Sequence, residues 1–352
     1  MKRVLLMVLA LTLVAWAARA DPIVIGAVYN LTGSQAGLDV PSARGARLAV
    51  SDLNAGGGIR GHRLRLRLED GQSDPAVIAR KTRDILHDDG HTRALIGLSD
   101  TDMVLAAAPE AAAFKRLFVT SGATSPRLPE QVPTYLYLAC FGDNVQAAAA
   151  AEWAYEQGHR KVRLVVDEEM EYTRLLSGYF KARFVELGGQ LTEDGADLVF
   201  LAVGPEAAQS KAAELRSAGF SGPILGGDSL DLAGWQVDQV YFTTHAFLDR
   251  HPEFVQRYTE VYGEPPDAFS ALGYDTMMLL ASAMVRAGSF EPERIRKAMA
   301  DTREFSGLTG RLAYDEGQRI PRKSVFLVEI SGGKRKLVRE VVPQKVPAPQ
   351  PR

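Results

Sequence analysis

Residues 23–28 of the chain read IVIGAV, a short and nearly continuous apolar run. An apolar run without polar alternation is typical of a strand that is buried on both faces of a parallel sheet. Pro41 stands where a helix would begin, and apolar residues then recur at helical spacing as far as Leu53. In residues 64–68 leucine alternates with arginine, which indicates a strand with one face in water. The chain therefore opens with a strand, a helix and a second strand.

The same alternation of strand-like and helix-like stretches continues along the chain. It implies right-handed crossovers and mainly parallel sheets, so the predicted fold class is α/β. In such sheets ligands bind outside the carboxyl ends of the strands, and functional groups are therefore expected just after each strand. The further strand-like stretches are residues 94–97, 117–121, 162–167, 197–202 and 224–228.

Length and composition exclude several classes of protein. The 352 residues exceed the size at which one core usually stops growing, about 250–300 residues, which predicts two domains. The single cysteine, Cys140, excludes a disulfide framework and a cysteine-based zinc site. Lysine and arginine number 41 against 43 aspartate and glutamate, so no basic excess points to nucleic acid. No nucleophile elbow, metalloprotease motif or phosphate-binding loop occurs, and we expect neither an enzyme nor a bound metal or cofactor.

The first twenty residues have the three-part layout of a secretory signal peptide. Lys2 and Arg3 form a short positive end, residues 4–17 are apolar, and residues 18–20 read Ala-Arg-Ala, which offers small residues for a signal peptidase. The apolar run is shorter than the ~20 residues that span a bilayer, and we expect no later stretch to be apolar enough to cross a membrane. We therefore expect a soluble protein that is exported to the periplasm and cleaved after Ala20.

Small hydroxyls, glycines and one acid follow the predicted strands. Thr101 comes after residues 94–97, Thr124 comes after residues 117–121, and Asp228 ends the last strand-like stretch. Hydroxyls and free backbone N–H groups at helix starts suit a carboxylate, whereas an aspartate suits an ammonium group. Capping of the following helix is the alternative role for these residues, since Ser, Thr and Asp are favoured caps.

An ordered set of motifs resembles the periplasmic branched-chain amino-acid and amide-binding proteins, which are the type I solute-binding proteins of ABC importers. The set spans nearly the whole chain after the signal peptide, in the order expected for that family. The resemblance implies two doubly wound Rossmann-like lobes, joined by three crossover strands and closed on a ligand between them. The motifs are Leu31-Thr32-Gly33 and residues 42–50 (SARGARLAV), 54–61 (NAGGGIRG), 73–76 (SDPA), 121–126 (SGATSP), 262–266 (YGEPP) and 271–275 (ALGYD).

By matching position, the resemblance implies a ligand site with contributions from both lobes. Thr101 and Thr124 would donate hydroxyls to a ligand carboxylate. Gly122 and Ala123 belong to the same ligand loop, in which Gly122 would offer backbone groups. Asp228 takes the place of the acid that pairs with a ligand ammonium in the family.

Two further positions of the site follow from the same resemblance. Tyr172 falls where the second lobe commonly supplies an aromatic across the cleft, although it could also be the start of a surface helix. Leu38 falls where the family often has an aromatic over the side-chain pocket.

Only residues 192–195 stand where relatives usually have a linker and a full helix, so the second lobe is expected to be shortened.

The resemblance also implies a domain division and a function. Lobe 1 would comprise residues 21–139 and 247–319, lobe 2 residues 140–246 and 320–345, and a proline-rich tail would follow at residues 346–352. The protein would be a monomeric, periplasmic substrate-binding component of an ABC importer, which takes up a small amino acid, amide or aromatic acid by hinge closure. Its partner would be a permease complex in the inner membrane. A periplasmic receptor that signals to a membrane partner is the alternative.

Overall fold

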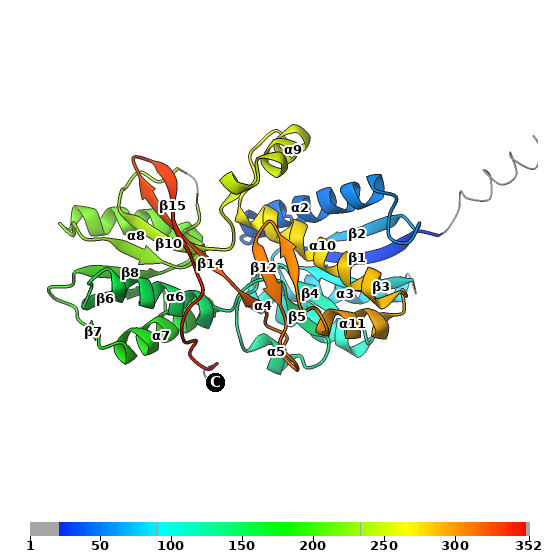
Figure 1. Ribbon diagram of the computed structural model, residues 1–352, viewed down its shortest axis with the longest axis horizontal. Coiled ribbons are helices and arrows are strands. Elements are labelled where there is room, and N and C mark those ends of the chain that lie inside the picture. Colours follow the sequence, from blue (N-terminus) through cyan, green and yellow to red (C-terminus); the bar gives the residue numbers. More distant parts are fainter. Residues whose placement is uncertain (1–20, 89–90, 233, 350–352) are drawn as a thin grey trace, which may run out of the picture.

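The computed structural model describes residues 21–88, 91–232 and 234–349, and the predicted signal peptide, residues 1–20, lies outside this part of the chain. Two β-sheets lie side by side along the long axis of the molecule, each with its own helices (Figure 1). This arrangement confirms the predicted α/β fold. We call the unit around the five-stranded sheet the first lobe and the unit around the seven-stranded sheet the second lobe.

The first lobe contains five parallel strands, which are β1 (Ile23–Tyr29), β2 (Leu64–Asp70), β3 (Thr92–Gly97), β4 (Phe118–Thr120) and β5 (Leu136–Leu138). Their order across the sheet is β2-β1-β3-β4-β5. Every residue of β1 is buried, as the apolar run predicts, because this strand lies inside the sheet with helices on both faces.

Helices cover the two faces of this sheet and form a separate core on each. On one face pack α2 (Ala36–Ala55), α10 (Ala268–Ala287) and α11 (Pro292–Ala300), and on the other α3 (Pro75–Asp88) and α4 (Thr101–Ala113). Alternate residues of β1 serve the two cores: Ile25 enters the first and Val28 the second. The remaining elements are α5 (Leu128–Gln131), η2 (Leu248–Arg250), α9 (Pro252–Tyr262) and the small sheet of β11 (Phe305–Gly307), β12 (Gly310–Ala313) and β13 (Arg322–Lys323).

The second lobe has a mixed sheet in the order β15-β14-β10-β9-β8-β6-β7. Five strands run parallel: β6 (Lys161–Val166), β7 (Gln190–Leu191), β8 (Leu198–Ala202), β9 (Ile224–Gly226) and β10 (Val240–Thr244). The strands β14 (Val325–Ser331) and β15 (Lys334–Val341) complete the sheet in antiparallel fashion. One face is covered by α6 (Asp143–Glu156) and α7 (Glu171–Glu186), the other by α8 (Pro205–Ser217) and the single turn η1 (Asp228–Leu230). In the described chain β7 leads to β8 without a helix, which is the shortening that the sequence predicts.

The chain crosses between the lobes three times: between β5 and α6, between β10 and η2, and between β13 and β14. The sequence places the third boundary at residue 320, but Arg322 and Lys323 still pair with β12, so the chain leaves the first lobe at Ser324. The buried Lys323 donates from Nζ to the carbonyl oxygen of Ala139, 3.0 Å away on the first connection. Burial lowers the pKa of Lys323 to about 8. The connections are thus packed against each other rather than loose.

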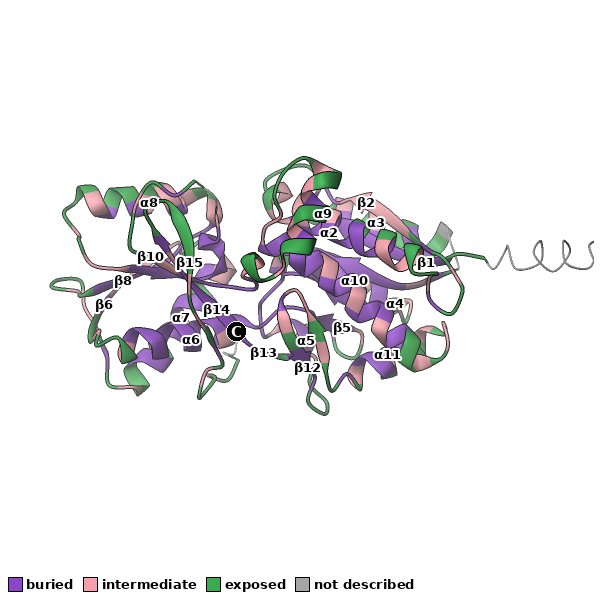
Figure 2. Ribbon diagram, turned by 45° about the horizontal axis from the view of Figure 1, so that its top comes forward, coloured by how far each residue is buried: buried purple, intermediate pink, exposed green. Residues whose placement is uncertain are grey.

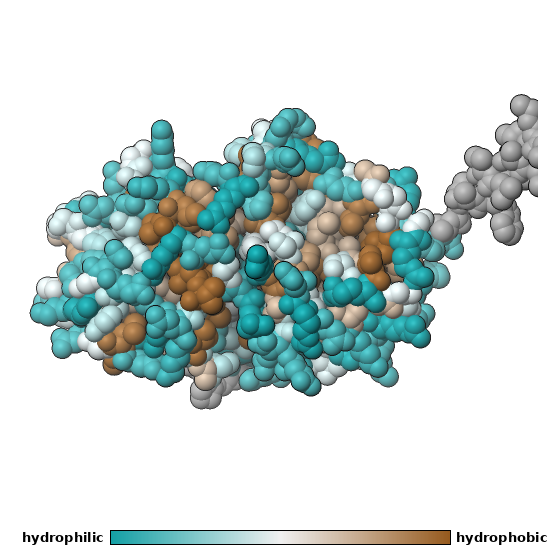
Figure 3. Space-filling model, viewed as in Figure 1, coloured by the Kyte–Doolittle hydropathy of each residue, from teal (hydrophilic) through white to brown (hydrophobic). Residues whose placement is uncertain are grey.

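Burial follows the sheets and the inner faces of the helices (Figure 2), and hydrophilic residues cover most of the face shown in Figure 3. One expectation was wrong: α10 is long and apolar enough to cross a membrane by length and composition. However, 78% of its apolar window is buried inside the protein, where it forms part of the core on one face of the first-lobe sheet. Its apolarity therefore serves the packing of the lobe.

The contact between α2 and α10 depends on two glycines. A Cβ atom added at Gly273 would overlap the carbonyl oxygen of Ser42, and one added at Gly45 would overlap the carbonyl oxygen of Ser270. The helices therefore approach each other more closely than any side chain would allow. This contact holds the C-terminal part of the chain onto the N-terminal part within the first lobe.

We expect Gly273→Ala to destabilise the protein by about 1–3 kcal/mol or more, because the overlapping atom belongs to the rigid backbone of α2. The matched control is Gly37→Ala on α2, where an added Cβ meets nothing within 4 Å. Alanine is the better helix former there, so this variant should be as stable as the parent or slightly more so. Urea unfolding of the three proteins measures the difference, and equal midpoints would contradict the close-contact argument.

Candidate ligand-binding site

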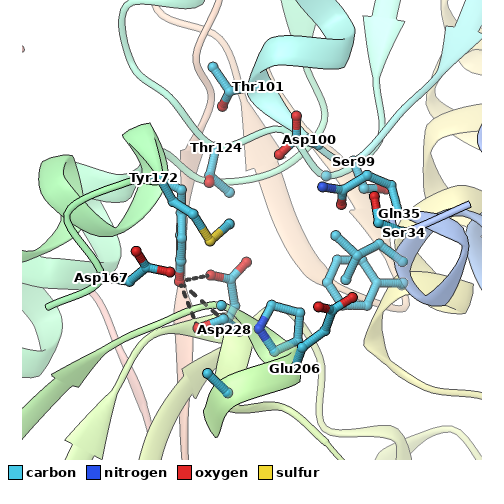
Figure 4. Close-up of a pocket in the computed structure, with 18 residues that line it drawn as sticks. Ser34, Gln35, Ser99, Asp100, Thr101, Thr124, Asp167, Tyr172, Glu206 and Asp228 are labelled. Atoms are coloured by element: carbon cyan, nitrogen blue, oxygen red, sulfur yellow. Dashed lines mark hydrogen bonds between the residues drawn. The ribbon is translucent and has the colours of Figure 1, made fainter. Parts of the chain in front are cut away.

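A cavity of about 360 Å³ lies between the two lobes (Figure 4). Its walls come from the carboxyl ends of strands, as predicted: β3 and β4 on the first lobe, and β6, β8 and β9 on the second. A volume of this size suits a small organic ligand, since such sites are usually about 300–1,000 Å³. A molecule bound here would contact both lobes.

The wall from the first lobe presents hydroxyls at the start of a helix. Thr101 is the first residue of α4, and Asp100, not Thr101, caps this helix by accepting from the backbone N–H groups of Asp102 (2.9 Å) and Met103 (3.2 Å). The alternative role of Thr101 as the helix cap is therefore wrong. Thr101 and Thr124 are both nearly buried and both line the cavity. Two hydroxyls beside a helix N-terminus suit a carboxylate.

Gly122 allows the loop after β4 to lie close against the loop after β3. An added Cβ at Gly122 would lie 2.9 Å from the Cβ of Ser99, which is too close for any other residue without a shift. The backbone of the loop that contains Gly122 and Thr124 can therefore line the cavity beside Thr101.

The wall from the second lobe presents a buried carboxylate, that of Asp228. Its Oδ1 accepts from the Tyr172 hydroxyl (2.8 Å) and from Gln146 Nε2 (2.9 Å), and its Oδ2 lies 3.0 Å from His245 Nε2. Burial alone would raise the pKa of Asp228, but the hydrogen bonds from His245, Gln146 and Tyr172 outweigh it and hold the pKa below its ordinary value. Asp228 is therefore ionised at neutral pH. No capping hydrogen bond of its side chain is described at η1, so the capping alternative does not account for its position.

A second buried carboxyl beside this site behaves in the opposite way. Burial raises the pKa of Asp143, at the start of α6, to about 8, so it is largely protonated at neutral pH. Gln146 bridges the two groups, since its Nε2 donates both to Asp228 and to Asp143 Oδ1 (3.1 Å). The Gln146 Oε1 accepts from Thr243 Oγ1 (2.9 Å), which fixes the orientation of the amide. Of these two buried carboxyl groups, Asp228 thus carries the negative charge.

Apolar side chains line another part of the cavity. Leu38 of α2 and Phe269 of α10 pack with the same first-lobe core, and Met170 and Pro205 face them from the second lobe. An apolar ligand side chain can be desolvated there.

The structure brings together six of the seven residues that the sequence nominated. Ala123 does not line the cavity: it is fully buried in the core and its carbonyl oxygen accepts from Cys140 Sγ. Tyr172 lies on α7 and reaches into the site, so it is not merely the start of a surface helix. The six residues that line the cavity are Leu38, Thr101, Gly122, Thr124, Tyr172 and Asp228.

Other residues in or beside the cavity had weaker signals in the sequence or none. Asp167 and Ser229 follow strands and could have been nominated by the same rule as Asp228. Phe269 and Gln146 lie on helices, where nothing in the sequence indicates which side of the helix faces the cleft.

The cavity is acidic. Four carboxyl side chains line it, and among the described residues no lysine, arginine or histidine does. The described residues also contain no group of three or more His, Cys, Asp or Glu placed to hold a metal ion. The four carboxyl groups are those of Asp100, Asp167, Glu206 and Asp228.

An ion pair joins the lobes at the edge of the site. Arg127, which precedes α5 in the first lobe, places Nη1 3.3 Å from Glu171 Oε1 at the start of α7 in the second lobe. The Arg127 side chain is 12% exposed and that of Glu171 24%, so the pair is partly shielded from water. The two lobes are therefore in direct contact beside the cavity.

Comparison with known proteins agrees with this geometry. A model of the periplasmic binding protein family matches residues 22–335, and the chain belongs to this family. The chain is 24% identical over 335 residues to a Leu/Ile/Val-binding protein homolog of Brucella melitensis, covering 86% of this chain and 87% of that one. The resemblance to leucine-binding-protein-like solute-binding proteins of ABC transporters is thereby confirmed.

Two solved structures illustrate the fold. A leucine binding protein from Thermotoga maritima superposes with a TM-score of 0.82 at 28% identity, covering 91% of this chain and 99% of that one. A solute binding protein of an ABC transporter from Rhodopseudomonas palustris, in complex with 3,4-dihydroxybenzoic acid, gives a TM-score of 0.81 at 19% identity, covering 93% and 99%. Proteins of this fold thus include one named for binding leucine and one in complex with an aromatic acid.

Proposed function

We propose that the protein is the periplasmic substrate-binding component of an ABC importer and that its ligand is a small amino acid or a close relative with both an ammonium and a carboxylate group. One observation carries this proposal: the ionised carboxylate of Asp228 lines the same cavity as the hydroxyls of Thr101 and Thr124, from the opposite lobe. The family membership and the named relatives support the transport role.

A zwitterion would satisfy each wall of the cavity. Its ammonium would bind Asp228, whose Oδ2 accepts one described hydrogen bond and has capacity for another. Its carboxylate would accept from Thr101, at the start of α4, and from Thr124, in the loop after β4. Its side chain would lie against Leu38 and Phe269. Charge-assisted hydrogen bonds at both ends of the ligand would fix its orientation.

The acidic lining favours an amine-bearing ligand over an aromatic acid. With four carboxyl groups and no basic residue among the described lining residues, an anion without an amine would gain no ion pair and would be repelled by Asp228. The relative with 3,4-dihydroxybenzoic acid shares only the fold at 19% identity. We therefore place amino acids first, with amides next.

The mechanism would be hinge closure. We take the lobes as predicted from the sequence, with the third boundary moved from residue 320 to Ser324: residues 21–139 with 247–323, and residues 140–246 with 324–345. A ligand that contacts Asp228 on one lobe and Thr101 on the other binds the closed form better than the open one, and it shifts the population toward the closed form. The Arg127–Glu171 ion pair would form together with closure. A permease complex would recognise the closed protein, which we expect to act as a monomer and without catalysis.

Export is part of this proposal. Residues 1–20 would direct secretion to the periplasm and would be removed after Ala20. N-terminal sequencing of the exported protein should begin at Asp21, and recovery of an intact Met1 from the periplasm would contradict the signal-peptide assignment.

We expect Asp228→Asn to weaken binding of an amino acid about thirty- to several-thousand-fold, because truncating a buried charge pair costs about 2–5 kcal/mol. Asp167→Asn is the matched control: it lines the same cavity but is only half-buried, and its Oδ1 accepts from the N–H of Glu169. It should change affinity by less than about tenfold. Thr101→Ala should lie between the two, since it removes one hydrogen bond to a charged group.

The measurement is a thermal-shift screen of amino acids, amides and aromatic acids, followed by calorimetry of the parent and variants with the strongest hit, because a bound ligand raises the melting temperature. If Asp228→Asn binds within about threefold of the parent, the ammonium role is wrong, since this is far below the cost of breaking a buried charge pair. A screen without any hit would contradict the binding role itself.

A further inference from the structure

His245 lies behind the proposed ammonium site and on the connection between the lobes. It is the first residue after β10, where the chain begins its second crossing, and it is 1% exposed. Its ring stacks on Phe141, with 3.7 Å between ring centroids and 21° between planes. Phe141 belongs to the first crossing, between β5 and α6. The imidazole of His245 thus belongs to one of the three connections about which the lobes would move, and it packs against a second.

The same imidazole holds the ligand-facing carboxylate. His245 Nε2 lies 3.0 Å from Asp228 Oδ2, whereas Gln146 and Tyr172 both donate to Oδ1. His245 Nδ1 is buried and has no hydrogen-bond partner among the described residues. The neutral ring with its proton on Nε2 fits these surroundings, because a proton on Nδ1 would be buried without an acceptor.

We propose that His245 is a positioning residue for the ligand: its Nε2–H orients Asp228, and a second proton on the ring would compete with the ligand ammonium for the charge of that carboxylate. The inference rests on the proposed function, since it concerns an amine-bearing ligand at Asp228. It adds that ligand release is linked to proton uptake at the hinge.

The other charged groups around His245 leave Asp228 as its direct charge partner. Lys323, the last residue of β13 before the third connection, disfavours a proton on the ring, whereas Asp231 favours one. The Asp231 carboxylate, however, is engaged by Arg335 and by the Thr244 hydroxyl. Burial, the largest effect, lowers the pKa of His245 below its ordinary value of 6.5.

The sign of the pH effect follows from competition. A ligand ammonium at Asp228 lowers the pKa of His245 further, because two cations then share one carboxylate. By linkage, protonation of His245 must weaken the ligand to the same extent. Protonation of His245 should therefore lower the affinity as the pH drops below the pKa of this histidine, by up to about tenfold per pH unit for one linked proton.

Calorimetry with L-leucine as the probe, at about pH 7.5 and about pH 5, tests this prediction across the range in which histidine titrates. The parent should bind less tightly at the lower pH, and at that pH it should release protons on binding. In His245→Gln the amide can still donate to Asp228 but cannot take up a proton, so we expect near-parental affinity at the higher pH and a change of less than about threefold between the two. His245→Ala removes the donor and should weaken binding at both pH values. His91→Gln, at an exposed position outside the cavity, is the control and should keep the parental pH response.

A purely structural role predicts a different pattern: Gln and Ala would weaken binding alike and the pH response of the parent would persist in His245→Gln. That result would overturn the proposal. A ligand-free arm separates it from the proposed function. In NMR titrations of the ring nitrogens, Asp228→Asn should lower the pKa of His245, because the ring loses its carboxylate partner. An unchanged titration of His245 in Asp228→Asn would overturn the proposal whatever L-leucine does, whereas failure of L-leucine to bind the parent would count against the proposed ligand class alone.

Discussion

An ionised carboxylate buried between two lobes is costly unless donors replace the water it loses, and the architecture of this protein is arranged around that requirement at Asp228. The donors come from three separate elements: Gln146 from α6, Tyr172 from α7 and His245 from the end of β10. The positions of these three elements are set by the second-lobe cores, in which α6 and α7 pack on the buried strands β8, β9 and β10. The charge of Asp228 is therefore a property of the whole second lobe.

The opposite lobe supplies hydrogen-bond donors for the other end of the ligand. Thr101 and Thr124 follow the ends of β3 and β4. The loop after β4 lies close against Ser99 in the loop after β3, because Gly122 has no side chain. Neither wall encloses a ligand by itself, and the lobes touch beside the cavity through Arg127 and Glu171. A ligand with opposite charges at its two ends is therefore the natural bridge between the walls, and the energy of binding it is available to hold the lobes together.

The sequence predicted much of this because the α/β fold places functional groups by a simple rule. The apolar run of β1 and the alternation of strands and helices indicated parallel sheets, and the strand ends then pointed to Thr101, Thr124 and Asp228. The prediction of Ala123 as a site residue was wrong, because local packing decides where a loop residue points. Here the carbonyl oxygen of Ala123 accepts from Cys140 Sγ. Gln146 and Phe269 were missed since they lie on helices, and which helix face meets the cleft is decided by tertiary contacts far away in sequence. Family resemblance brought in Tyr172 and Leu38, which no strand-end rule would have found.

In the mechanism that we propose, an ammonium group of the ligand pairs with Asp228 across a closed cleft. The most direct measurement is mass spectrometry of the small molecule that stays with the protein through mild purification and is released on denaturation. We predict a compound with a free amine and a carboxylate, recovered in equimolar amount from the parent and lost from Asp228→Asn. Recovery of an aromatic acid without an amine, in equal amounts from both proteins, would show that no such pairing occurs.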